Sequence, residues 1–193
     1  MSSRAIAAEK RQHIIETAYT LFKRDGFHAT GIDRIIAEAE VAKMTMYRHF
    51  PSKDGLIVEV LNWRADRFKR QLDRLSETAM MPDEKITAIF DWHERWFDSP
   101  DFHGCLFQHA LAEFGEPDHA VFEAVMRQKR DLQDRIRNIL AQSVPEGRAP
   151  HIAMTLFMLI EGATMLAQMG QGKAAIDNAR KVAADLLAMR ARQ

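Results

Sequence analysis

The sequence predicts an all-α protein of about nine helices, with a small N-terminal helical domain followed by a larger C-terminal helical bundle. Two observations favour this class. Apolar residues recur at intervals of three and four along most of the chain, which is the spacing of amphipathic helices. No window keeps the strict two-residue alternation of a half-buried strand, and no Asn-Gly hairpin signal occurs.

Three N-terminal helices follow from this spacing and from the residues that interrupt it. The first covers about residues 5–24 and stops at Asp25-Gly26, since glycine suits the left-handed position after a helix. Thr30 is expected to cap a short helix that carries Ile32, Ile35 and Ile36. A second short helix covers residues 43–49 and ends before Pro51.

Longer helices make up the rest of the chain. Ser52 caps a long helix, and Pro82 opens the next one. Further helices are expected over about 103–114, from Glu116-Pro117-Asp118 onward, over 150–169 and over 173–191. We therefore expect a small helical domain over residues 1–52 and a larger one over 53–193. The long helix from Ser52 joins them without a flexible linker.

Composition narrows the class of protein. The chain has 193 residues, of which 47% are hydrophobic and 28% charged, as in ordinary globular domains. A single cysteine excludes an intramolecular disulfide framework. The N-terminus has no apolar signal-peptide core, and no run of 18 uncharged apolar residues predicts a membrane span. We expect a soluble cytoplasmic protein with no membrane partner.

The stretch from Gly26 to Gly55 carries the chemical signal. Two short helices joined by a tight turn at Ala39-Glu40-Val41 have the size that fits a DNA major groove. Residues 1–53 hold nine Lys or Arg and six Asp or Glu, a net charge of +3, so the remainder of the neutral chain carries −3. Phosphate and base contacts are predicted from the following residues: Thr30, Gly31, Lys43, Met44, Thr45, Tyr47, Arg48, His49 and Lys53.

This stretch resembles the DNA-binding domain of the TetR family of transcriptional regulators. The matching positions are Thr17-Ala18, Leu21-Phe22, Gly26-Phe27, Thr30, Ile32, Ile35-Ile36-Ala37, Ala39, Val41, Tyr47, His49-Phe50 and Ser52-Lys53. The resemblance implies a helix-turn-helix, a ligand-binding domain and a homodimer. It also implies that Thr30, Thr45, Tyr47, His49 and Lys53 contact DNA, mostly its backbone.

Three residues depart from the family pattern. Glu40 stands where the family usually has glycine, so a positive φ there would cost about 1 kcal/mol or more. Ala42 lacks the usual capping hydroxyl, which contributes about 0.5–2 kcal/mol. Met44 replaces a small residue at the start of the recognition helix, where it either contacts a thymine methyl or shifts which bases are read.

The C-terminal domain is rich in aromatic residues and methionines, which suit a pocket for a flat or hydrophobic effector. The competing interpretation is that these residues simply form the core. His109 and Glu113 lie one helical turn apart and are expected to pair. Glu161 stands alone in an apolar helix and needs a partner if it is buried. The candidate pocket residues are Trp63, Trp92, Trp96, Phe102, Cys105, Phe107, His109, Phe122, Met126, Met158, Glu161 and Met165.

Together with the resemblance, the last two helices suggest a two-fold four-helix dimer interface, because they carry more apolar surface than one bundle needs. The alternative is that they pack only on their own core. The candidate interface residues are Ile152, Leu156, Leu159, Ala163, Leu166, Ile176, Val182 and Leu186.

The resulting hypothesis is a ligand-responsive homodimer, a repressor of an inverted-repeat operator that a hydrophobic or aromatic effector releases. One alternative is a redox or electrophile sensor signalling through Cys105. A helical enzyme is the other, but no catalytic motif, cofactor-binding loop or metal-ligand spacing is present, so we predict no enzyme activity, cofactor or metal. The sequence does not separate repressor from activator.

Overall fold

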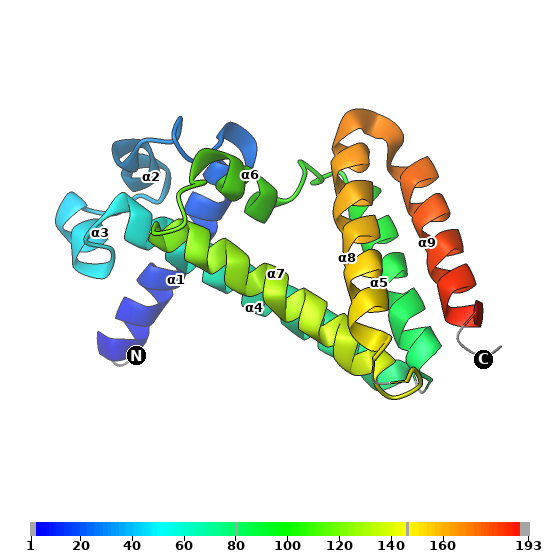
Figure 1. Cartoon of the computed structure of the whole chain (residues 1–193). Helices are drawn as coiled ribbons and strands as arrows, with labels where there is room; N and C mark the ends of the chain where they lie inside the picture. Colours follow the sequence, from blue (N-terminus) through cyan, green and yellow to red (C-terminus); the bar gives the residue numbers. More distant parts are fainter. Residues whose placement is uncertain (1–2, 80, 146, 190–193) are drawn as a thin grey trace. The chain divides into compact units, whose positions relative to one another are not determined.

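The computed structural model describes residues 3–79, 81–145 and 147–189. These residues form nine α-helices and one short π-helical segment, with no strand among them. The predicted all-α class is therefore confirmed (Figure 1). The elements are α1 (Ser3–Asp25), α2 (Ile32–Glu38), α3 (Lys43–His49), α4 (Lys53–Thr78), α5 (Pro82–Phe97), α6 (Leu106–Glu113), α7 (Ala120–Leu140), α8 (Ala149–Leu166), the π-helical segment (Ala167–Gln171) and α9 (Gly172–Met189).

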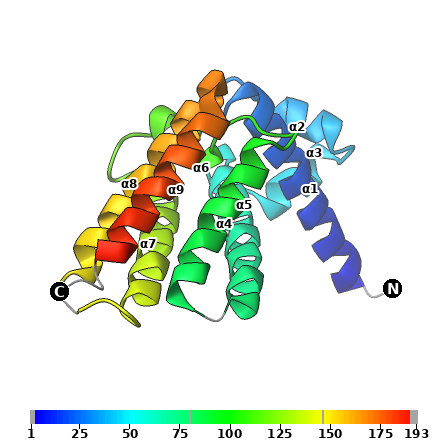
Figure 2. The ribbon, with the colours of Figure 1, turned by 90° about the vertical axis from the view of Figure 1, so that its right-hand side faces the viewer.

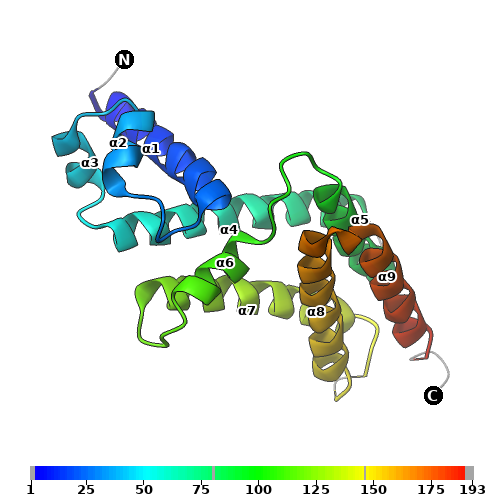
Figure 3. The same ribbon diagram turned by 90° about the horizontal axis from the view of Figure 1, so that it is seen from above.

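The chain divides into two compact units. Unit 1 contains residues 1–67 and 106–126, and unit 2 contains residues 68–105 and 127–193. The predicted boundary at 52/53 differs from this division, because the first half of α4, α6 and the start of α7 pack with the N-terminal helices. Helices α4 and α7 each continue from one unit into the other without a break (Figure 3).

Unit 1 is built around the apolar faces of α1 and α4. Helix α2 packs against both α1 and α3. Large side chains fill the interior between these helices, and most are completely inaccessible to solvent. The largest of them are Ile14, Ile15, Phe22, Phe27, Ile35, Met46, Phe50, Leu56, Ile57 and Leu61.

In unit 2, α5, α8 and α9 lie side by side (Figure 2). One continuous apolar core joins these three helices to the second halves of α4 and α7. Arg180 of α9 forms ion pairs with Asp91 (2.9 Å) and Glu94 (2.6 Å) of α5, so the two helices are also held at their polar edge. Lys173 adds a second bond to Glu94 at 2.8 Å.

The predicted helix ends agree with the structure at several points. Gly26 (φ +85°) ends α1, and Gly170 (φ +81°) marks the break between the last two long helices. The Ser52 hydroxyl accepts the Gly55 N–H at 3.0 Å, as expected of a cap. The predicted cap of α2 was wrong: Gly31 holds that position, and Thr30 instead donates to the Gly26 carbonyl at 2.7 Å. Residues 190 and 191 of the last predicted helix lie outside the described residues.

Candidate nucleic-acid interface

Helix α3 has one buried side and one exposed side. Met46 is fully buried, as is Phe50 directly after the helix, and they anchor α3 in the core of unit 1. Other residues of the helix are exposed, among them Met44 (81% exposed) and Tyr47 (39% exposed). A short, firmly held helix with an exposed polar and apolar side is suited to insertion in a major groove.

The turn between α2 and α3 keeps a left-handed residue at the position where the family usually has glycine. Glu40 has φ +51°, the one non-glycine residue of the described chain with a positive φ. The Val41 N–H donates to the Ile36 carbonyl at 3.2 Å, which closes the turn. Ala42 starts α3 without a side-chain cap. The turn therefore keeps the helix-turn-helix geometry with a non-glycine residue in the left-handed position, at a cost of about 1 kcal/mol.

Basic side chains surround the end of α3. Burial lowers the pKa of His49 below its ordinary value of 6.5, and the nearby charges of Arg48, Arg11 and Lys10 lower it further. His49 is therefore mainly neutral at neutral pH, and the Nε2 atom of its ring is shielded from solvent. Arg48 is exposed and carries the positive charge that a phosphate would meet.

The predicted contact residues are not equally accessible. Gly31, Lys43, Met44, Tyr47 and Arg48 are exposed, whereas Thr45, His49 and Lys53 are half-buried. Lys53 donates to the His28 carbonyl at 3.3 Å. Thr30 has no exposed surface, and its predicted DNA contact is therefore wrong for the side chain: the hydroxyl is turned inward to the Gly26 carbonyl.

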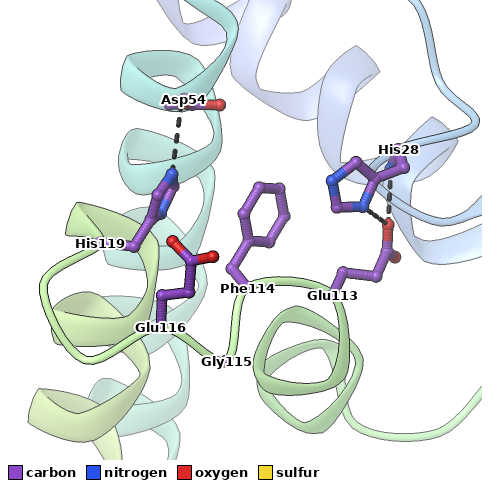
Figure 4. Close-up of a pocket in the computed structure, with 7 residues that line it drawn as sticks. All are labelled: His28, Asp54, Glu113, Phe114, Gly115, Glu116 and His119. Atoms are coloured by element: carbon purple, nitrogen blue, oxygen red, sulfur yellow. Dashed lines mark hydrogen bonds and ion pairs between the residues drawn. The ribbon is translucent and has the colours of Figure 1, made fainter.

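A polar corner lies where α6 ends and α7 begins (Figure 4). The Glu113 carboxylate accepts the Phe27 N–H at 2.9 Å, the His28 N–H at 2.6 Å and a contact with His28 Nδ1 at 2.7 Å. The sequence suggested a pair of Glu113 with His109, whereas these bonds of Glu113 go to residues 27 and 28. The carboxylate reaches across 85 residues of sequence, a contact that no local spacing signals.

The same corner holds three stacked rings. The Phe114 ring lies between His28, with centroids 4.7 Å apart, and His119, with centroids 5.0 Å apart. His119 Nε2 lies 3.4 Å from the Asp54 carboxylate in the first turn of α4. These residues, with Gly115 and Glu116, line a pocket of about 430 Å³.

The predicted pocket residues are divided between the two units. Trp63, Phe107, His109, Phe122 and Met126 belong to unit 1, whereas the others belong to unit 2. Within unit 1, Phe107 is buried in the core, and Trp63 packs edge-on against Tyr19 with centroids 5.2 Å apart.

Unit 2 contains an aromatic cluster around α5, defined by Phe68 of α4, by Trp92, His93, Trp96 and Phe97 of α5, and by Phe102. Trp96 contacts Trp92 (5.4 Å between ring centroids) and Phe102 (5.0 Å). Phe68 and His93 are buried, while the other four rings are half-buried. Trp92, Trp96 and Phe102 therefore lie together, and part of their ring surface is accessible to solvent.

The predicted need of Glu161 for a partner is confirmed. Lys129 of α7 donates to the two Glu161 carboxylate oxygens at 2.7 and 2.6 Å, and the Lys129 side chain is only 11% exposed. Lys129 Nζ also lies 3.8 Å from Cys105 Sγ, and Cys105 is buried. Glu161 and Cys105 therefore lie together, but Met158 and Met165 are exposed and do not line an interior pocket with them.

The predicted dimer residues fall into two groups. Ile152, Leu156, Ala163 and Ile176 are buried in the core of unit 2, so assigning them to an interface was wrong: the chain itself already covers them. Leu159 and Leu186 are partly buried against the same core. Leu166 and Val182 stay exposed, together with four methionines of α8 and the segment after it, namely Met154, Met158, Met165 and Met169.

Two further properties of the described residues bear on function. No three His, Cys, Asp or Glu side chains among them gather closely enough to hold a metal ion. The stretch Ala149–Ala188 is long and apolar enough to cross a membrane by length and composition alone, a test that core helices of soluble proteins also pass. Only a third of its most apolar window is buried within the chain.

Comparison with known proteins agrees with this geometry. The family model described as "Bacterial regulatory proteins, tetR family" matches residues 14–60, and "Tetracyclin repressor-like, C-terminal domain" matches residues 82–183. A crystal structure of a TetR-family transcriptional regulator from Streptomyces coelicolor is 30% identical, with a TM-score of 0.89 over 95% of this chain and 96% of that one.

Curated relatives include transcriptional regulators. The HTH-type transcriptional regulator LmrA of Bacillus subtilis is 26% identical over 161 residues, 82% of this chain and 86% of LmrA. The HTH-type transcriptional repressor KstR2 of Mycolicibacterium smegmatis is 33% identical over 87 residues, which are 43% of this chain and 40% of that protein.

Proposed function

Because the chain belongs to the TetR family of DNA-binding transcriptional regulators, we propose that it is a ligand-responsive repressor that binds an inverted-repeat operator as a homodimer. The observation that carries the DNA-binding part is α3, whose apolar side is buried while Lys43, Met44, Tyr47 and Arg48 are exposed. The similarity to KstR2, a transcriptional repressor, supports repression, and we propose a cytoplasmic location because the curated relatives are bacterial transcriptional regulators.

The chemistry of the exposed residues indicates how α3 would contact DNA. Lys43 and Arg48 neutralise phosphates, and the Tyr47 hydroxyl donates to a phosphate oxygen. The thioether of Met44 has no polar group to read a base edge, so it suits the methyl group of thymine. Two copies of α3 must stand about 34–36 Å apart to enter successive major grooves.

Selection of bound duplexes from a random DNA pool tests this mode. The protein should enrich a palindromic site with thymine at one position in each half. The Met44→Ala variant should still enrich the palindrome but lose the thymine preference, and Lys69→Gln, a change at an exposed lysine of unit 2, should alter neither. Failure of the folded protein to enrich any sequence would contradict operator binding.

The homodimer is proposed from exposed apolar surface on the last helices. Met158, Met165, Leu166, Met169 and Val182 are exposed in the single chain, and a second copy would remove them from water. Sedimentation should show a dimer that the Met158→Glu variant dissociates. Met44→Glu introduces the same charge at another exposed methionine and should leave the dimer intact. A wild-type monomer at micromolar concentration would refute the dimer.

The effector is proposed to be flat and hydrophobic, because the half-buried rings of Trp92, Trp96 and Phe102 offer it aromatic surface. Titration of aromatic compounds should quench tryptophan fluorescence in the wild type, and Trp96→Leu should weaken binding without loss of the fold. The buried state of Cys105 argues against the alternative of a cysteine sensor, since a sensing thiol must be reached by its reagent.

A further inference from the structure

We propose that Glu113 is a positioning residue for operator binding, which fixes the loop between α1 and α2 in the conformation that DNA recognition requires. The proposal rests on the proposed operator binding and adds a residue that makes no DNA contact itself. The geometry that points to it lies within unit 1, between the end of α6 and the loop that precedes the helix-turn-helix.

The loop leaves α1 with backbone N–H groups that no helix satisfies. Gly26 is in the left-handed conformation, and the next two N–H groups, of Phe27 and His28, both point at one carboxylate. The His28 ring adds a third contact to the same group (Figure 4). A carboxylate can accept all three, because each of its oxygens has two lone pairs.

The charge of Glu113 is part of this arrangement. The carboxyl is partly buried, which by itself raises its pKa, but the bonds from Phe27, His28 and the His28 ring outweigh burial and hold the pKa below 4.5. The group is therefore ionised at neutral pH. Its fit to the loop is close, since a side chain at Gly26 would come within 3.1 Å of the Glu113 Oε1 atom.

The loop held by Glu113 leads directly to the DNA-facing residues. The His28 carbonyl accepts a hydrogen bond from the Lys53 ammonium at 3.3 Å, and the Thr30 hydroxyl donates to the Gly26 carbonyl at 2.7 Å. The exposed Gly31 follows Thr30 and precedes α2. A shift of residues 27–28 therefore moves both Lys53 and the start of the helix-turn-helix.

Residues next to Glu113 also contact the first turn of α4. Phe114, next to Glu113 in sequence, is stacked between His28 and His119, and His119 pairs with Asp54 beside Lys53. The loop and the first turn of α4 thus meet one short segment, residues 113–119. Glu116 belongs to that segment and lines the pocket, but it is exposed, and no bond from it to the loop is present.

Glu113→Gln and Glu116→Gln make a matched pair of variants, because each removes one negative charge from the same pocket. In Glu113→Gln, one of the two loop N–H groups faces the side-chain NH₂, a donor that cannot accept its bond. We expect this variant to bind the selected operator about tenfold more weakly. Its binding to a random duplex should stay within twofold, since phosphate charge dominates that binding. Glu116→Gln should bind both duplexes as the wild type does.

Hydrogen exchange gives a readout that does not depend on DNA. The Phe27 and His28 amides should exchange faster in free Glu113→Gln than in the wild type or in Glu116→Gln. If these amides exchange faster but operator affinity is unchanged, Glu113 is only structural and the proposal is wrong. If the amides are unaffected, Glu113 does not hold the loop, and the proposal is also wrong.

A second variant covers the case in which Glu113→Gln fails to fold. His28→Phe keeps a ring to stack on Phe114 but loses the Nδ1 contact, and we expect a loss of operator affinity of about threefold. Unchanged affinity of folded His28→Phe would then overturn the proposal. If the wild type enriches no operator at all, the proposed function fails instead, and the exchange rates still decide whether Glu113 holds the loop.

Discussion

The ion pair between Lys129 and Glu161 gives a quantitative test of how unit 2 is held together. Lys129→Met keeps the length of the apolar stem and removes the ammonium group, and with it the two bonds of 2.6 and 2.7 Å to Glu161. The change leaves a carboxylate that is 24% exposed without its lysine. We expect a loss of stability, because a partly buried charge is then less well compensated.

The size of the loss follows from burial. Breaking a fully buried pair costs about 3–5 kcal/mol, and breaking an exposed pair costs about 0–1 kcal/mol. Lys129 is nearly buried and Glu161 is partly exposed, so the expected loss is about 1–3 kcal/mol. At about 2–4 °C per kcal/mol for a chain of this size, the Tm should fall by roughly 2–12 °C.

The control is Lys173→Met, because Lys173 makes a bond of similar length to Glu94 but its side chain is 68% exposed. That variant should lose clearly less stability than Lys129→Met, because water screens an exposed ion pair. Urea unfolding at one fixed protein concentration measures both, since a dimer's stability depends on concentration. The double variant Lys129→Met/Glu161→Leu should recover most of the loss. If Lys129→Met costs no more than Lys173→Met, burial does not determine the strength of this pair.

Three further predictions concern the turn, the acid stability and the DNA contacts. Glu40→Gly should raise the free energy of unfolding by about 0.5–1 kcal/mol, because glycine adopts a positive φ without strain, and unchanged urea unfolding would refute this. Hydrogen bonds from Lys173 and then Arg180 lower the pKa of Glu94 from 4.5 to about 2. The ionised Glu94 carboxylate therefore stabilises the folded state above pH 4.5, and this contribution should be lost as the pH falls towards 2. After solvent screening we expect the free energy of unfolding to fall by about 1–2 kcal/mol. Lys173→Gln should make this fall smaller, as measured by unfolding at a series of acid pH values. Lys53→Gln should lower the slope of log affinity against log salt by about 2 per dimer, and an unchanged slope would exclude Lys53 as a phosphate contact.

The order and type of the helices could be predicted because they depend on local patterns. Apolar spacing located the helices, and Gly26, Ser52 and Gly170 marked ends that the structure confirms. The unusual turn at Glu40 was also accessible, since a left-handed position is a local property of the backbone. In each case the deciding interactions lie within a few residues of one another.

Assignments that depend on which side of a helix is covered were less successful. The dimer prediction selected apolar residues of the last helices, but Ile152, Leu156, Ala163 and Ile176 face the chain's own core. Apolar character is the same for a core and for an interface, so sequence alone could not separate them. Thr30 failed for a related reason, because a hydroxyl suits a phosphate and a buried carbonyl equally well.

The contact between Glu113 and the loop after α1 could not be predicted from the sequence of the N-terminal helices. The N-terminal pattern predicted the helices that present Lys43 and Tyr47, but a recognition helix also needs its neighbouring loop fixed in space. Two consecutive backbone N–H groups after Gly26 require an acceptor, and the loop itself does not supply one. That requirement can be stated from the sequence once the helix end is known, but not which distant carboxylate fulfils it. The acceptor comes from α6, so the conformation of the loop between α1 and α2 depends on a helix outside the N-terminal family match.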